Sequence, residues 1–149
     1  MTRKPMDETT IRAKAEEFIS ALHALEQAES GSGELLDALV ALYADDAKLT
    51  NSALRLTEEE LAGPDGIRTF WDEYKKTIGK ANSAFHQVTV NGEAAGLFWV
   101  TEGITTPDQP TPMSYDGSTL LVFNEAGKIS HFHGYYDTHQ FNRTIGREH

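Results

Sequence analysis

The sequence predicts an α+β domain in which helices come first and antiparallel strands follow. Helical patterns, with apolar residues at three- and four-residue spacing, occupy the first half of the 149 residues. After Gly79 the pattern changes to alternating strands joined by turn residues. Segregated helices and strands are typical of the α+β class. We expect the sheet to curl around the helices and to enclose a pocket.

Three helices are expected. Thr9 or Thr10 can cap the first, which extends to about Gln27. The second covers about residues 34–43, and the third covers about residues 65–78 after a Gly-Pro turn. Their apolar residues predict one buried face on each helix.

Five strands are expected. Alternation and turn signals place them at residues 48–52, 83–90, 94–106, 115–123 and 129–136. Asn91-Gly92 is a strong hairpin signal between the second and third of these strands. The length suits one domain, for which we expect bounds of residues 9–142, with tails at 1–8 and 143–149.

Composition restricts the partners and the chemistry. Lys and Arg number 13 and Asp and Glu number 23, so the formal charge of −10 disfavours nucleic acid and anionic lipid. The lack of cysteine excludes disulfides, thiolate metal sites and cysteine nucleophiles. No apolar run approaches the roughly 18 residues of a membrane helix, and no apolar stretch follows the basic N-terminus. We therefore expect a cytoplasmic protein that binds no membrane.

Four segments together carry a family resemblance. They are Leu42-Tyr-Ala-Asp-Asp-Ala47, Gly66-Ile-Arg-Thr-Phe-Trp71, and residues 93–103 and 123–129. In this order and spacing, the chain resembles the SnoaL-like branch of the nuclear transport factor 2-like superfamily over about residues 9–142. The resemblance implies a cone-shaped α+β fold, usually dimeric, with an apolar pocket. Members of this family include isomerases, cyclases, epoxide hydrolases and dehydratases, so the fold does not fix the function.

Strand alternation divides the last strand into two faces but does not say which one is inside. The resemblance implies that Phe132, Gly134 and Tyr136 line the pocket. The same matching turns a further set of residues inward: Phe98, Val100, Glu102, Thr119, Leu121 and Phe123, together with Phe18, Asn51, Trp71 and His86.

The opposite face of the last strand then carries His131, His133 and Tyr135, where family dimers often meet. We therefore expect a homodimer through this outer face. Two histidines on one strand face also suggest a metal site, but no third ligand is evident nearby, and we predict none.

Known chemistries of the family match this sequence poorly. The isomerase positions hold Asn51, Phe18 and Thr119, which lack the required acid and base groups. An epoxide hydrolase is disfavoured because Gly134 matches a carboxylate position and residues 115–123 contain no arginine. His86 matches one of two dehydratase histidines, while the other position falls near Ile104 or Thr105. Among the residues expected to face inward, Glu102 is the only carboxylate.

His86 and Glu102 therefore form the sharpest catalytic hypothesis, since a carboxylate tunes a histidine for proton transfer. Their placement depends on the hairpin turn. A two-residue turn pairs His86 with Leu97 and puts it on the face opposite Glu102. A three-residue turn that includes Glu93 pairs His86 with Phe98 and, by the family match, puts His86 and Glu102 in the pocket.

The sequence thus favours a pocket protein for a small apolar or aromatic molecule. The first hypothesis is a cofactor-independent isomerase, dehydratase or cyclase with His86 as the acid–base group and Glu102 orienting it. Asn51 and Tyr136 would hold a polar substrate group. The wall would comprise Phe18, Trp71, Phe98, Val100, Thr119 and Phe132. The alternatives are a non-catalytic binding protein, or an association module that uses the outer sheet face.

Overall fold

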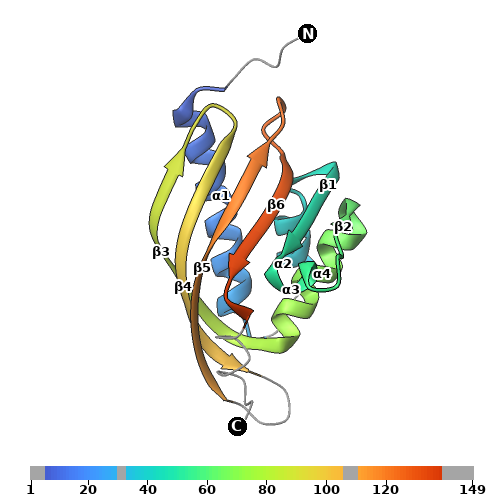
Figure 1. Cartoon of the computed structure of the whole chain (residues 1–149), viewed down its shortest axis with the longest axis vertical. Coiled ribbons are helices and arrows are strands. Elements are labelled where there is room, and N and C mark those ends of the chain that lie inside the picture. The colour runs from blue at the N-terminus through green and yellow to red at the C-terminus, as the bar shows by residue number, and fades with distance from the viewer. Residues whose placement is uncertain (1–5, 30–32, 106–110, 139–149) are drawn as a thin grey trace.

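The computed structural model describes residues 6–29, 33–105 and 111–138 and contains a curved sheet with helices packed against one side (Figure 1). The helices are α1 (Glu8–Gln27), α2 (Gly33–Val40), α3 (Ser52–Arg55) and α4 (Gly63–Thr77). The strands are β1 (Tyr43–Asn51), β2 (Leu61–Ala62), β3 (Ile78–Val90), β4 (Ala94–Thr105), β5 (Pro112–Phe123) and β6 (Ile129–Tyr136). The predicted α+β class is confirmed.

The sheet has six strands in the order β2-β1-β6-β5-β4-β3. Strands β3 to β6 form an antiparallel series, as the turn signals predict. Strand β6 also pairs in parallel with β1, so the last strand lies beside the first long one. Within the described residues no helix is long and apolar enough to cross a membrane.

Helix α1 packs against the inner face of the sheet through its apolar stripe. Ile11, Phe18 and Leu25 are among its buried residues. The predicted cap is wrong: the Asp7 side chain accepts the Thr9 N–H at 3.2 Å, so the helix begins at Glu8. An aspartate is as good a cap as threonine, and it also favours the positive end of the helix dipole.

Several boundaries differ from the predictions because tertiary pairing overrides the local pattern. Helix α2 ends at Val40, and β1 begins at Tyr43, which pairs with Ile129 of β6. Residues 52–62, for which the sequence shows no clear pattern, form the short helix α3 and the two-residue edge strand β2.

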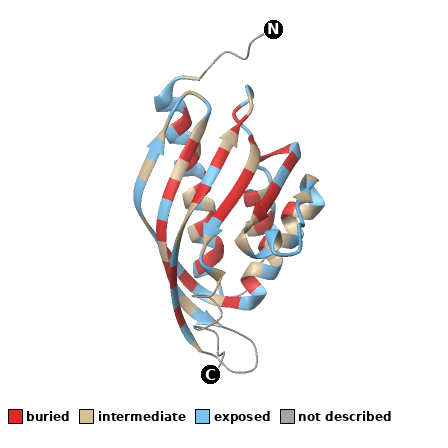
Figure 2. Ribbon diagram, viewed as in Figure 1, coloured by how far each residue is buried: buried red, intermediate tan, exposed pale blue. Residues whose placement is uncertain are grey.

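Strand β4 shows which of its faces is inside. Leu97, Trp99 and Thr101 are buried, whereas Phe98 and Glu102 are exposed. The alternation of buried and exposed residues is visible along the central strands (Figure 2). The predicted inward orientation of Phe98, Val100 and Glu102 is therefore wrong. A one-residue error in assigning a strand face reverses every side chain on it.

The hairpin between β3 and β4 uses two registers. Near the turn Val90 pairs with Ala95, which neither of the two expected turns gives. Beyond His86 the pairing of Phe85 with Trp99 and of Asn82 with Glu102 is the one that the three-residue turn predicts. A β-bulge at His86 then removes one residue from the pairing, because Phe85 pairs with Trp99 and Gln87 pairs with Phe98.

Candidate functional site

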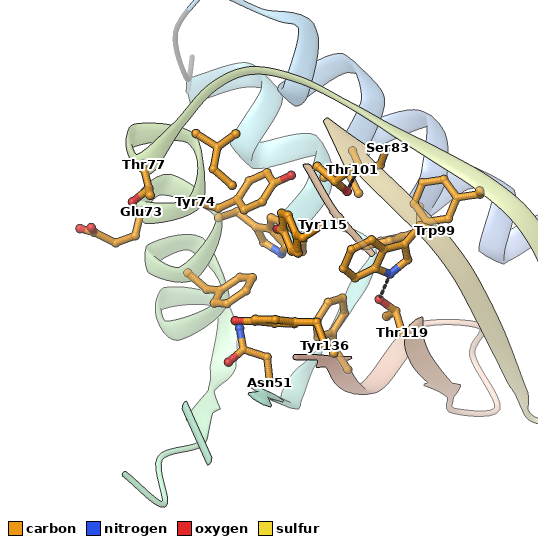
Figure 3. A pocket seen from close by; sticks show the side chains of 18 residues that line it. Asn51, Glu73, Tyr74, Thr77, Ser83, Trp99, Thr101, Tyr115, Thr119 and Tyr136 are labelled. Atoms are coloured by element: carbon orange, nitrogen blue, oxygen red, sulfur yellow. Dashed lines mark hydrogen bonds between the residues drawn. The ribbon is translucent and has the colours of Figure 1, made fainter. Parts of the chain in front are cut away.

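A cavity of about 270 Å³ lies between the inner face of the sheet and helices α1 and α4 (Figure 3). Aromatic side chains make up half of its 18 lining residues: Phe18, Phe70, Trp71, Tyr74, Phe85, Trp99, Tyr115, Phe132 and Tyr136. Ligand pockets commonly enclose roughly 300–1,000 Å³, so this one suits a compact molecule. Glu73 and Thr77, which are exposed, mark where the wall meets solvent.

The aromatic wall has two parts. On the helix side, Trp71 meets Phe132 edge to face, with ring centroids 5.7 Å apart. On the sheet side, Tyr115 makes edge contacts with Trp99 at 5.4 Å and with Tyr136 at 5.6 Å. Such edge-to-face contacts fix the orientation of the rings.

Both indole N–H groups donate hydrogen bonds. Trp71 donates to the Tyr43 hydroxyl at 3.2 Å. Trp99 donates to the Thr119 hydroxyl at 2.9 Å (Figure 3). These bonds leave the indole rings as apolar surfaces towards the cavity. Most of the wall is therefore suited to hydrocarbon or aromatic groups.

One end of the cavity is polar and rests on a buried carboxylate. Glu26 of α1 has no exposed surface. Its Oε2 accepts the Tyr74 hydroxyl at 2.7 Å and the Ser83 hydroxyl at 2.6 Å, and its Oε1 accepts the Ser83 N–H at 3.0 Å. The Ser83 oxygen also lies 2.6 Å from that of Thr101. Tyr74, Ser83 and Thr101 line the cavity and gather at this end (Figure 3).

A buried lysine lies behind the carboxylate. Lys75 Nζ donates to the main-chain carbonyls of Glu26, Ala28 and Gly79 at 3.1, 2.6 and 2.8 Å. Burial lowers the pKa of Lys75, while the Glu26 charge opposes that shift. The ammonium group thus provides a nearby positive charge for Glu26 and also satisfies carbonyls at the end of α1.

The cavity tyrosines are neutral phenols. The pKa of Tyr74 is raised well above its usual value by burial, then by Tyr115 and by the Glu26 carboxylate, although the nearby Ser83 hydroxyl opposes the rise. Burial also raises the pKa of Tyr115 and of Tyr136, and a hydrogen bond to the backbone at Ala53 offsets part of the rise for Tyr136. These hydroxyls can relay or share a proton, but they do not ionise near neutral pH.

Six of the side chains expected in the wall do line the cavity: Phe18, Asn51, Trp71, Thr119, Phe132 and Tyr136. The amide oxygen of Asn51 is already engaged, because it accepts the Leu54 N–H at 2.8 Å and caps α3.

His86, Phe98, Val100 and Glu102 lie outside the cavity, which corrects their expected positions. His86 and Phe98 share a groove on the outer sheet face with Asp116 and Tyr135. Glu102 pairs with Asn82, four residues from His86 and about 13 Å along the strand at the usual rise. His86 and Glu102 share a face, as the three-residue turn predicts, but it is the outer face, and they are too far apart to act together.

The outer face of β6 carries the predicted interface residues. His133 stacks on Tyr135 with ring centroids 4.0 Å apart. His131 lies 3.8 Å from a Glu60 oxygen. Within the described residues, no three His, Asp or Glu side chains are placed to hold a metal ion.

Sequence reasoning missed Glu26 and Tyr74. A usable signal was present: Glu26 follows Leu22 by four residues and Phe18 by eight, so it lies on the apolar stripe of α1. A carboxylate in that position is a candidate for a buried polar network.

The fold and the cavity define a protein whose curved sheet and helices enclose a pocket. A comparison with known families identifies the family. Residues 16–132 match the SnoaL-like domain, so the chain belongs to this family, which confirms the resemblance. No curated protein gives a match.

Solved structures share the fold at low sequence identity. An NTF2-like protein of unknown function from Burkholderia pseudomallei is 16% identical with a TM-score of 0.74, covering 93% of this chain and 98% of that one. TerC co-crystallised with polyporic acid is 14% identical with a TM-score of 0.72, covering 91% and 98%. An LEH-like epoxide hydrolase from M. tuberculosis is 17% identical with a TM-score of 0.69, covering 93% and 90%.

Proposed function

We propose that this protein binds a small, mostly apolar or aromatic molecule in the cavity and moves a proton on it without a cofactor. One observation carries the proposal: an aromatic cavity ends in hydroxyl groups that are hydrogen-bonded to a fully buried carboxylate. A buried charged group beside a pocket is costly to maintain and is typical of functional sites.

Glu26 and Tyr74 are the groups that we assign to proton transfer. A ligand proton moves to the Tyr74 oxygen as the Tyr74 proton moves to Glu26 across their 2.7 Å hydrogen bond. The reverse movement can return a proton to a different ligand atom, so the exchange needs no other reactant. Isomerisation, dehydration and cyclisation all contain such a step. Asn51 and Tyr136 are proposed to hold a second polar group of the substrate.

A cavity-blocking variant tests ligand binding. A Cβ at Gly134 would meet Asn51 Cβ at 3.4 Å and the Phe132 ring at 3.6 Å, so Gly134→Leu directs bulk into the cavity without a severe backbone clash. Both tryptophans of the chain line the cavity, so their fluorescence reports occupancy. We expect 2-methoxynaphthalene to quench the wild type saturably and the Gly134→Leu variant far less.

The control is Ala84→Leu, which adds similar bulk at an exposed position of β3. This variant should bind like the wild type. Equal quenching of the wild type and the Gly134→Leu variant would place binding elsewhere and overturn the proposal.

Deuterium exchange tests the chemistry. In D2O, the protein should accelerate exchange of the acidic C–H protons of 2-tetralone, an apolar enolisable ketone, as followed by NMR. Tyr74→Phe removes the relaying hydroxyl but keeps the ring, and it should return exchange to the background rate while binding persists. A wild-type rate equal to background would leave a non-catalytic binding protein as the function.

We also propose a homodimer through the outer sheet face, because that face carries exposed apolar side chains. Phe98, Leu120 and Tyr135 are 39%, 36% and 46% exposed. They lie on adjacent strands beside His131 and His133. Contiguous apolar surface of this kind favours association.

Sedimentation tests the dimer. Leu120→Glu puts a charge in the apolar face and should shift the protein from dimer to monomer. Ala13→Glu, at an exposed position of α1, is the matched control and should leave the dimer intact. A monomeric wild type would contradict the proposal.

A further inference from the structure

At the polar end of the cavity, a count of donors and acceptors determines which acceptor each hydroxyl hydrogen points to. Each hydroxyl carries one hydrogen and two lone pairs, whereas an ionised carboxylate only accepts. All three hydrogen bonds described above for the Glu26 carboxylate come from donors: the Tyr74 hydroxyl, the Ser83 hydroxyl and the Ser83 N–H. In this arrangement the Glu26 side chain acts only as an acceptor.

The same count determines which hydroxyl donates in the contact between Ser83 and Thr101. The Ser83 hydrogen points to Glu26 Oε2, so Ser83 has no second hydrogen for its 2.6 Å contact with Thr101. Thr101 must therefore be the donor in that contact. Both hydroxyl chains, Tyr74 to Glu26 and Thr101 through Ser83 to Glu26, direct their hydrogens away from the cavity.

We infer that the polar end of the cavity is a hydrogen-bond acceptor and that the natural ligand presents a hydroxyl or N–H donor there, as a phenol, an enol or an alcohol does. Tyr74 and Thr101 line the cavity, and with their hydrogens committed to Glu26 they offer oxygen lone pairs to it. A ligand ketone or ether at this end would place its oxygen against the lone pairs of Tyr74 and Thr101, with no hydrogen between them. This inference rests on the proposed function, because it needs a ligand in the cavity.

Matched probes test the inference. 2-Naphthol and 2-methoxynaphthalene share a ring system and an oxygen, but only the naphthol carries a donor hydrogen. We expect the wild type to bind 2-naphthol about tenfold more tightly by tryptophan fluorescence, because a hydrogen bond into a charged network discriminates by at least this factor. Equal affinities would overturn the inference but leave the proposed function standing.

Changing the Glu26 carboxylate to an amide tests whether the ligand preference comes from the direction of the hydrogen bonds or from the shape of the cavity. Glu26→Gln keeps the size but supplies an N–H donor, so the Tyr74 or Ser83 chain can reverse and point a hydrogen into the cavity. The preference for 2-naphthol should fall below threefold, while binding of 2-methoxynaphthalene stays or improves. Glu29→Gln makes the same change at an exposed residue near the end of α1 and should keep the tenfold preference.

A second variant keeps the test valid if Glu26→Gln does not fold. Thr101→Val removes one of the acceptor oxygens with little change of shape and leaves the Glu26 bonds to Ser83 and Tyr74 in place. It should weaken 2-naphthol binding several-fold and leave 2-methoxynaphthalene unchanged. A preference that survives this change and Tyr74→Phe would overturn the inference. Failure of both probes to bind the wild type would overturn the proposed function and the inference with it.

Discussion

His133 occupies an environment that disfavours its charged form. Its side chain, on the outer face of β6, is buried and stacks on Tyr135, and its Nε2 has no hydrogen-bond partner in the described part of the chain. Burial lowers its pKa, and the nearby Arg55 and His131 lower it further, while Glu60 opposes them. The native protein therefore holds His133 neutral where an unfolded chain would already bind a proton.

The pH dependence of stability follows from this difference. Below about pH 6.5 the unfolded chain takes up a proton at His133 that the native protein resists, so the free energy of unfolding falls as the pH falls. Above that pH both states are neutral and the effect vanishes. His133→Phe should give a shallower decline between pH 7 and pH 5 in urea denaturation.

The control for that experiment is His86→Gln, which removes an exposed histidine from the same sheet. Its pH profile should follow that of the wild type. A His133→Phe protein whose decline matches the wild type would show that His133 does not set the acid sensitivity.

At the scale of elements, the contact of α1 with α4 depends on one charged residue from the buried side of each helix. Glu26 continues the apolar stripe of α1, and Lys75 follows Trp71 by four residues on α4. The helices were predictable from their periodicity, but this pairing was not. It requires the ends of α1 and α4 to meet, which only the packed structure determines.

Removing the Lys75 ammonium should destabilise the protein strongly. Lys75→Met keeps the apolar stem but leaves one buried and two partly buried carbonyls without their donor, so we expect a loss of about 3 kcal/mol. Urea denaturation measures it. Lys76→Met, which removes an exposed ion pair with Asp72, should cost less than about 0.5 kcal/mol. Similar losses for the two variants would contradict the assigned role of Lys75.

Strand β4 shows where prediction from sequence reaches its limit at the level of elements. Its existence and length follow from its alternating pattern, yet the sequence alone leaves its inner face open. Phe98 and Trp99 are both large and apolar, so either one fits an interior position. The bond from the Trp99 indole to Thr119 joins β4 to β5 on the inner face, and local sequence carries no sign of it.

At the scale of the whole molecule, the parallel pairing of β1 with β6 joins the two halves of the chain. The sequence order predicts helices before strands, but it does not predict that the final strand enters the middle of the sheet. That position depends on contacts far apart in sequence, such as Leu49 with Phe132. The interior of the sheet is complete only when β6 is in place.

Hydrogen exchange should reveal this dependence. Amides of β6 are protected by partners on both sides and should exchange slowest, close to the rate of global unfolding. Amides of β2, a two-residue edge strand, should exchange orders of magnitude faster. Mass spectrometry of the labelled protein measures both. Exchange of β6 as fast as β2 would show that the central pairing opens independently.

The bulge at His86 has a consequence for comparing this chain with its relatives. Without His86, Phe85 would still oppose Trp99, the next residue would still oppose Phe98, and inner and outer residues would continue to alternate. A relative that lacks one residue here can therefore keep the same cavity wall. Alignments of related sequences should allow a gap at His86, because forcing this stretch into continuous alignment would match inward residues of one protein with outward residues of another.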